Sequence, residues 1–176
     1  MRSVMTRRGF TLGGTALAAS AMMAVTPSSA AGLEEPSDRP ILTIGGRIKR
    51  TNDGDKARFD RAMLEKLGMV TFETTTPWYN GLVKFEGVPM AKLLEFVGAE
   101  GTIATAVALN DYITEIPITD FAQYGVILAL KRDGNYMPVR DKGPLFIVYP
   151  YDSNPELKHQ KYYGRSAWQV AQLIVK

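Results

Sequence analysis

The run GPLFIVYP at residues 143–150 constrains the fold more than any other stretch of the chain. Five consecutive apolar residues, rich in aromatic and β-branched types, lie between two proline-containing breaks. Such a run is typical of a central strand that is buried on both faces. Charged and polar residues precede it at 140–142 and follow it at 151–156. Because binding groups tend to lie on loops held by a rigid strand, we expect a functional site at its ends.

The first 30 residues have the features of an export signal. Arg7 and Arg8 precede a mildly apolar stretch over residues 13–25, and residues 28–30 are small. The apolar stretch is shorter than the roughly 20 residues that a membrane helix needs. The segment therefore resembles a twin-arginine signal that is cleaved after Ala30. An ordinary Sec signal and an uncleaved amphipathic anchor are the alternatives. We expect a periplasmic protein without stable membrane insertion.

Removal of residues 1–30 changes the charge of the protein. The whole chain has 21 Lys and Arg against 18 Asp and Glu, but three arginines lie in the signal, so the mature protein is neutral. It lacks the excess of basic residues that nucleic-acid binding needs, and this class is set aside. The absence of cysteine excludes disulfides, thiolate metal sites and thiol nucleophiles. The single histidine, His159, cannot build a metal site of several imidazoles.

After a flexible linker at residues 31–40, residues 41–176 are expected to form one domain of mixed α/β (α+β) class. Apolar patterns and turn signals predict strands at 41–48, 69–73, 105–109, 112–116, 126–130 and 168–175, and helices at 56–67, 89–97 and 119–124. Residues 110–111 are expected to close a tight hairpin. The polar segment 74–81 and the segment 152–164 are expected to be loops.

Several short motifs follow one another in a distinctive order. They are Phe85-Glu86-Gly87-Val88-Pro89 with Leu93-Leu94, Asn110-Asp111-Tyr112 with Ile116-Pro117, Leu128-Ala129, Asp133-Gly134, Lys142-Gly143-Pro144-Leu145, and Trp168. Their order and spacing resemble the molybdopterin-binding domain of the sulfite oxidase type, over most of residues 41–176. The resemblance implies a sulfite oxidase-like fold of mixed β-sheets with short helices. In the enzymes of that family a cysteine thiolate holds molybdenum, and the metal transfers oxygen atoms.

This chain departs from the family at the metal ligand. The position that matches the cysteine falls near Thr74 or Thr75, and a neutral hydroxyl has neither the charge nor the softness of a thiolate. The resemblance is closest to small, cysteine-free members, some of which look like periplasmic pterin-responsive regulators of a membrane enzyme that controls cyclic di-GMP. It therefore implies a pterin ligand without metal, and the periplasmic domain of such an enzyme as partner.

A pterin ring needs aromatic groups for stacking, an acceptor for its N–H groups and donors for its oxygen. We expect Trp78 and Trp168 to be stacking walls. We expect Asp111 to be the acceptor, and Arg165 with Ser166 to be the donors. The full set of predicted pterin-binding residues is Trp78, Asp111, Tyr149, Tyr163, Arg165, Ser166 and Trp168. Each of these residues has a structural alternative. Trp168 and Tyr149 can be core residues, Asp111 can serve the turn, and Arg165 can be a surface residue.

These observations predict an exported pterin-binding protein that senses its ligand and regulates a membrane signalling partner, with no metal and no catalytic residue. A periplasmic oxidoreductase subunit that holds the whole molybdenum cofactor, molybdopterin included, is the first alternative. The twin-arginine-like signal favours it, because that route exports folded proteins that often carry cofactors. A protein interaction domain without ligand is the second alternative.

Overall fold

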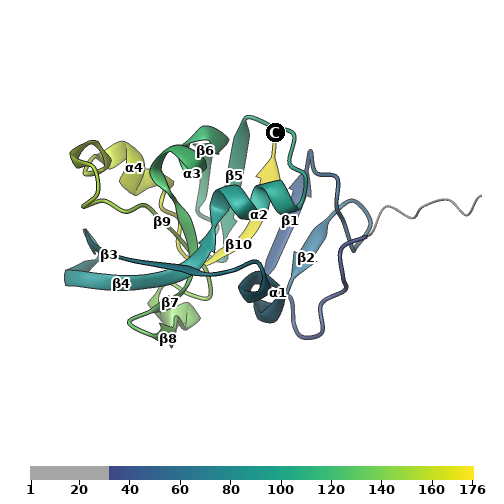
Figure 1. Ribbon diagram of the computed structural model, residues 1–176, viewed down its shortest axis with the longest axis horizontal. Coiled ribbons are helices and arrows are strands. Elements are labelled where there is room, and N and C mark those ends of the chain that lie inside the picture. The colour runs from purple at the N-terminus through teal and green to yellow at the C-terminus, as the bar shows by residue number, and fades with distance from the viewer. Residues whose placement is uncertain (1–31) are drawn as a thin grey trace, which may run out of the picture. The chain divides into compact units, whose positions relative to one another are not determined.

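A computed structural model describes residues 32–176, which form two five-stranded sheets and four short α-helices (Figure 1). This content confirms the predicted mixed α+β class. The export signal predicted over residues 1–30 lies outside the described residues. Within residues 32–176, no helix has the length and apolar character needed to cross a membrane.

The first sheet brings the first and last strands of the domain side by side. Its strands, in spatial order, are β2 (Ala57–Phe59), β1 (Leu42–Gly46), β10 (Val170–Val175), β5 (Ile103–Ala108) and β6 (Ile113–Pro117). β1 pairs with β10 in parallel, and the other pairs are antiparallel. A side chain at Gly46, where φ is +84°, would lie 2.2 Å from the Val175 carbonyl oxygen. Glycine therefore permits the close approach of the first and last strands.

The second sheet carries a long hairpin. Its strands are β3 (Val70–Thr76), β4 (Tyr79–Pro89), β7 (Ile127–Arg132), β8 (Asn135–Tyr136) and β9 (Phe146–Val148), with both β8 and β9 paired to β7. The prediction of a polar loop at 74–81 is wrong, because only residues 77–78 separate β3 from β4. Threonine is polar, yet its β-branched side chain favours strands, and this preference decides the conformation of residues 74–76.

Four α-helices connect the sheets, namely α1 (Arg61–Lys66), α2 (Met90–Phe96), α3 (Ile118–Tyr124) and α4 (Gln160–Arg165), together with the 3₁₀ turns η1 (Val139–Asp141) and η2 (Pro155–Leu157). The predicted helix 56–67 begins only at Arg61, because residues 57–59 pair with β1 and Asp60 accepts a hydrogen bond from Met63 N at 2.8 Å. The predicted loop 152–164 contains η2 and α4, whose first turn is capped by His159 Nδ1.

The described part of the expected linker, residues 32–40, is bound to the domain. Asp60 Oδ2 accepts hydrogen bonds from the backbone nitrogens of Ser37 and Asp38 at 2.8 and 3.0 Å. Asn52 Nδ2 donates to the Glu34 carbonyl oxygen at 2.7 Å. These bonds hold the segment against the domain, whereas composition suggested a flexible linker. A single buried carboxylate, Asp60, accepts most of them.

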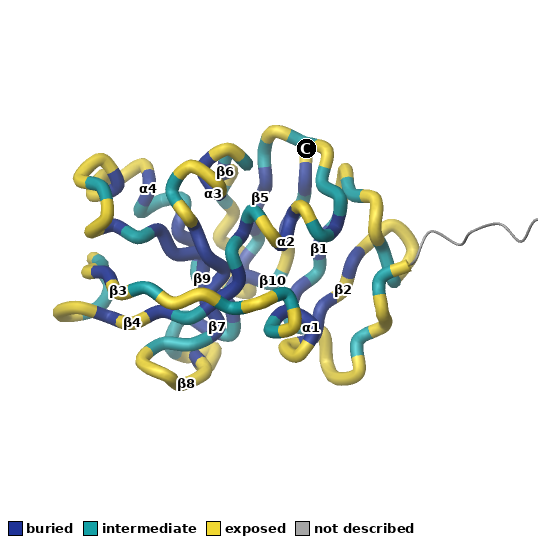
Figure 2. Tube along the Cα trace, in the orientation of Figure 1, coloured by how far each residue is buried: buried dark blue, intermediate teal, exposed yellow. Residues whose placement is uncertain are grey.

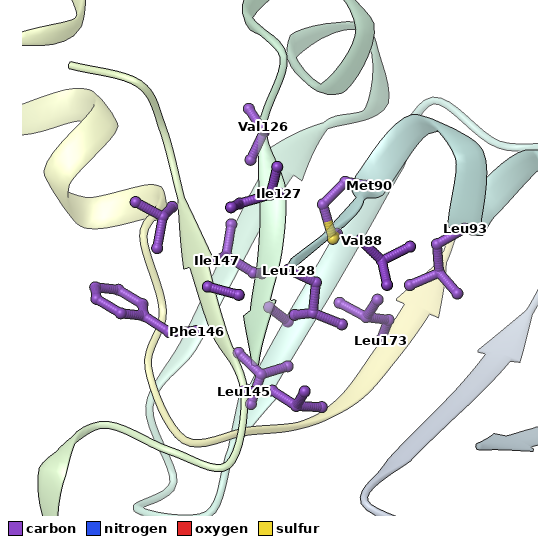
Figure 3. Packing of buried hydrophobic residues seen from close by; sticks show 14 of the residues in the cluster. Val88, Met90, Leu93, Val126, Ile127, Leu128, Leu145, Phe146, Ile147 and Leu173 are labelled. Atoms are coloured by element: carbon purple, nitrogen blue, oxygen red, sulfur yellow. The ribbon is translucent and has the colours of Figure 1, made fainter. Parts of the chain in front are cut away.

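The core lies between the two sheets. Residues 145–149 are fully buried, as the sequence predicts, and β9 runs beside β7 in the middle of the domain (Figure 2). Leu145 and Ile147 pack with Val88, Leu128 and Leu173 from three other strands (Figure 3). Each such buried side chain stabilises the fold by about 1.5–3 kcal/mol. The strand is therefore a rigid support for the loops at its ends.

Candidate functional site

An aromatic cluster joins the β3–β4 turn to β9 and to residues 151–168. Trp78, in the turn between β3 and β4, contacts four other rings at centroid distances of 5.4–6.2 Å, all close to edge-to-face. The members of this cluster are Trp78, Phe146, Tyr151, Tyr163 and Trp168. Pairs of this geometry add about 0.5–1.5 kcal/mol beyond the burial of their area. Trp78 is therefore held as the hub of the cluster.

A pocket of about 300 Å³ opens beside the aromatic cluster. We call it the aromatic pocket, and its lining comes from the β3–β4 turn, the β5–β6 turn and the segment from α4 to β10: Pro77, Trp78, Asn110, Tyr112, Gln160, Tyr163, Gly164, Ser166 and Trp168. None of these residues is charged. The pocket therefore offers aromatic surface together with amide, hydroxyl and backbone groups, which suits a flat, uncharged ligand.

Four of the seven predicted residues line this pocket, namely Trp78, Tyr163, Ser166 and Trp168. Sequence reasoning missed Asn110, Tyr112 and Gln160. The Tyr112 hydroxyl donates to the Gly164 carbonyl oxygen at 2.7 Å, so it joins the β5–β6 turn to α4 across the pocket. The motif Asn110-Asp111-Tyr112 could have indicated two of these residues, because it is one of the motifs on which the resemblance is based.

The two tryptophans do not form parallel walls. Their ring centroids are 5.6 Å apart and their planes meet at 74°, so Trp78 and Trp168 are in edge-to-face contact. No ring fits between two indoles in this arrangement. The expectation of a tryptophan clamp is therefore corrected: a ligand in the pocket can stack on one aromatic face, while the second indole borders it.

Three predicted residues lie outside the aromatic pocket. Tyr149 is fully buried, and its hydroxyl donates to Asp120 Oδ2 at 2.8 Å, while burial raises the pKa of this tyrosine. Arg165 forms an ion pair with the same carboxylate oxygen at 2.7 Å. Asp111 is exposed at the tip of the β5–β6 turn, with φ of +63°. Core packing describes Tyr149 and a turn role describes Asp111, whereas Arg165 is half-buried and ion-paired and so differs from the surface position that was its alternative.

Ser166 lines the pocket but its hydroxyl already has partners. Its Oγ donates to the Tyr162 carbonyl oxygen at 3.0 Å and is hydrogen-bonded to the Tyr151 hydroxyl. Burial raises the pKa of Tyr151, so this hydroxyl stays protonated. Tyr162 in turn donates to Glu156 at 2.7 Å. Ser166 therefore fixes the pocket wall and has no second proton to donate to a ligand.

Thr74 and Thr75, at the position that matches the metal ligand, are engaged in hydrogen bonds. Thr74 is buried, and its hydroxyl accepts from Asp152 N at 3.0 Å and donates to the Thr75 carbonyl oxygen at 3.3 Å. Thr75 donates from its backbone nitrogen and its hydroxyl to the Asp152 carboxylate. Lys158 and these bonds lower the pKa of Asp152 to about 2. These groups do not fit a molybdenum ligand, because the hydroxyls are neutral and already used.

A positively charged flank borders Trp168. Lys142 Nζ lies 4.7 Å from the Tyr79 ring centroid and 5.4 Å from that of Trp168. Arg132 lies 4.3 Å from the Tyr79 ring and pairs with Asp141 at 2.8 Å. The Tyr79 hydroxyl donates to the same aspartate at 3.0 Å, and burial is the main cause that raises its pKa to about 12. These contacts join the β3–β4 hairpin to the charged residues that precede β9.

Comparison with known proteins identifies no family and no curated relative. No protein-family model matches the chain, and no curated protein matches it significantly. Within residues 32–176, no group of three or more His, Asp or Glu side chains is arranged to hold a metal ion. The motifs of the sequence and the geometry of the aromatic pocket are therefore the features that point to a function.

Proposed function

We propose that this protein binds a pterin without molybdenum in the aromatic pocket, and that it acts in the periplasm as a regulator of a membrane signalling enzyme. The observation that carries the proposal is an aromatic-walled pocket with no charged residue in its lining. Its volume of about 300 Å³ lies at the lower end of the range for small-molecule sites. A fused two-ring ligand is of suitable size.

The polar groups of the pocket match the edge of a pterin. A pterin carries neighbouring N–H donors and a carbonyl acceptor, and an amide side chain presents both complementary groups. Asn110 and Gln160 supply two such amides, and Gly164 adds a carbonyl oxygen. Asn110 Oδ1 already accepts from Tyr112 N at 3.3 Å and the Gly164 oxygen from the Tyr112 hydroxyl at 2.7 Å, so each oxygen has one lone pair left for a ligand. Trp168 supplies a face for stacking. In this arrangement Asn110 takes the acceptor role that sequence reasoning gave to Asp111.

The same lining favours a free pterin over the whole molybdenum cofactor. Molybdopterin carries a phosphate, and phosphate sites are built from arginine, lysine or backbone N–H groups. None of the described lining residues of the aromatic pocket is cationic, and Lys142 lies outside the lining although its Nζ is 5.4 Å from the Trp168 ring. The Thr74 hydroxyl is occupied. The oxidoreductase alternative keeps the support of the twin-arginine-like signal, and metal analysis tests it. Stoichiometric molybdenum in the purified protein would reject the proposal.

A regulatory role follows from where the aromatic pocket lies. Its lining joins two β-turns and α4, so a ligand favours the arrangement in which these segments come together. Coupling of this kind is typically worth about 1–3 kcal/mol. Exposed apolar side chains flank the β5–β6 turn, where Leu109 is 54% and Ile113 59% exposed. A partner that contacts this turn would respond to the state of the pocket.

Calorimetric titration of the periplasmic protein with a dihydropterin tests the proposal. Trp168→Ala is expected to weaken binding about tenfold or more, since stacking of a flat base on an aromatic ring is worth about 1–3 kcal/mol. Tyr136→Ala, at an exposed aromatic residue outside the pocket, is the matched control and should leave the affinity unchanged. Equal affinities of wild type and Trp168→Ala would refute the stacking role.

A further inference from the structure

A second pocket is lined by residues of β2, α1 and α2 and by residues 32–34. Figure 1 shows β2 at the end of the domain opposite α4. We call it the α1 pocket. Its volume is about 310 Å³, and its lining residues are Gly32, Leu33, Glu34, Arg50, Phe59, Met63, Lys66, Leu67 and Phe96. It shares no lining residue with the aromatic pocket. Its chemistry therefore has to be considered separately.

The interior surface of the α1 pocket is apolar. Phe59 and Met63 are buried, and Phe96 packs against Phe59 with ring centroids 6.3 Å apart. Leu33 and Leu67 complete the apolar wall. No hydroxyl or amide side chain lines the pocket. A ligand that enters must therefore present an apolar body to this surface, because polar groups would lose their hydrogen bonds to water.

The rim of the α1 pocket carries one cation that has no acidic partner. Lys66 pairs with Glu34 at 3.5 Å. Arg50 forms no ion pair or side-chain hydrogen bond within residues 32–176, and residues 1–31 contain no Asp or Glu. Its guanidinium carbon lies 5.3 Å from the Phe96 ring centroid, and its backbone nitrogen is fixed to the Val97 carbonyl oxygen at 3.0 Å. The guanidinium thus lies at the pocket, and its donors have no side-chain partner among residues 32–176.

We propose that the α1 pocket binds a small apolar monocarboxylate. The planar guanidinium of Arg50 matches a carboxylate, with which arginine forms paired hydrogen bonds. The tail of the ligand packs on Phe59, Met63 and Phe96. Glu34 shares the rim, and its negative charge disfavours a ligand with a second anionic group. An unbranched acid of about eight carbons, or an aromatic acid of similar size, suits a pocket of this volume.

Calorimetric titration of the periplasmic protein with octanoate tests the assignment, and 1-octanol is the uncharged counterpart. Octanoate should bind at least tenfold more tightly than octanol, because a hydrogen bond to a charged group is worth about 1.5–3 kcal/mol. Arg50→Gln should remove this preference. Arg47→Gln, at an exposed arginine three residues away that does not line the pocket, should keep it. Failure of the wild type to bind octanoate, or equal loss in both arginine variants, would overturn the proposal.

Amide chemical-shift mapping locates the bound octanoate. The largest shifts should fall on the backbone amides of Phe59, Met63 and Phe96, while those of residues 160–168 stay unchanged. Leu67→Trp, which fills the pocket from the end of α1, should abolish these shifts. Shifts that cluster elsewhere would show that octanoate binds outside the α1 pocket, and this result would reject the site even if Arg50→Gln weakened binding.

Discussion

The two ends of the domain contain pockets of nearly equal volume but different chemistry. The aromatic pocket has about 300 Å³ and an uncharged lining taken from turns, whereas the α1 pocket has about 310 Å³, an apolar interior and charged groups at its rim. Volume alone therefore does not distinguish them. The number and charge of the polar groups are the basis of the two ligand classes that we propose, a neutral heterocycle at one end and an apolar anion at the other.

A carboxylate with a lowered pKa stabilises each end. Asp60 is fully buried and accepts from the Met63, Ser37 and Asp38 nitrogens, and these bonds lower its pKa. Asp152 is partly exposed and pairs with Lys158 at 2.6 Å, while it also accepts two bonds from Thr75. The α1 end thus depends on backbone hydrogen bonds to a buried group, and the aromatic end on a more exposed ion pair.

The largest effect is expected from a substitution of Asp120, which should affect the aromatic end and not the α1 end. Asp120→Ala leaves the buried Tyr149 hydroxyl and the half-buried Arg165 without their acceptor, so the free energy of unfolding should fall by about 3 kcal/mol in urea denaturation. Dihydropterin binding should weaken as well, because Arg165 belongs to the helix that carries Tyr163. Glu115→Ala, which breaks an exposed pair with Lys176, is the control and should not change the unfolding midpoint.

Octanoate binding should survive the same substitution, since Asp120 does not contact the α1 pocket. If Asp120→Ala lowered the affinities for dihydropterin and octanoate by the same factor, the two ends would respond as one unit. The difference between the two ends would then be contradicted.

The second prediction concerns the α1 end. Asp60→Ala removes the N-cap of α1 and the acceptor for residues 37–38, and it should lower the free energy of unfolding by about 2 kcal/mol. Hydrogen exchange of the Ser37 and Asp38 amides should accelerate. Asp38→Ala removes only an exposed bond to the next backbone nitrogen, so it serves as the matched control. Unchanged exchange in Asp60→Ala would contradict the anchoring role.

The third prediction uses pH. The pKa of Asp152 is about 2 in the folded state and about 3.9 in the unfolded chain, so its stabilising effect is complete above pH 4 and is lost as the pH falls toward 2. Wild type should be more stable than Asp152→Asn above pH 4, by about 1 kcal/mol or less because the ion pair is partly exposed. The difference should shrink with acidification. A constant difference from pH 5 to pH 2 would contradict this assignment.

The smallest expected effect is the coupling between the two ligands. The pockets share no lining residues and lie at opposite ends, so saturation with dihydropterin should change octanoate affinity less than about twofold. Titration of octanoate with and without dihydropterin measures this factor. A change of about fivefold or more would indicate a coupling of at least 1 kcal/mol, and the two ends would then communicate.

Sequence patterns predicted the elements whose local signals agree with their tertiary contacts. The buried run at 145–149, α2, the β5–β6 hairpin and the last strand are of this kind. The helix expected at 56–67 starts late because pairing with β1 overrides the helical spacing of residues 57–59. The strand at 74–76 was missed because polarity was taken as evidence for a loop.

The candidate site was predicted by residue type but not by geometry. Trp78, Tyr163 and Trp168 are large aromatic residues near the ends of strands, and they do lie together. Asp120 gave no signal, because its partners Tyr149 and Arg165 are 29 and 45 residues away along the chain. Asp111 does not line the aromatic pocket while its neighbours Asn110 and Tyr112 do, because the direction of side chains in a tight turn depends on backbone angles that composition does not specify.

The position of Trp78 and Trp168 has a practical consequence. They are the only tryptophans of the chain, and they lie in contact at the same end of the domain. Intrinsic fluorescence excited at the red edge of the indole band therefore reports on the surroundings of one pocket. The protein carries a built-in optical probe for the aromatic end, and events around α1 change that emission only if they reach across both sheets.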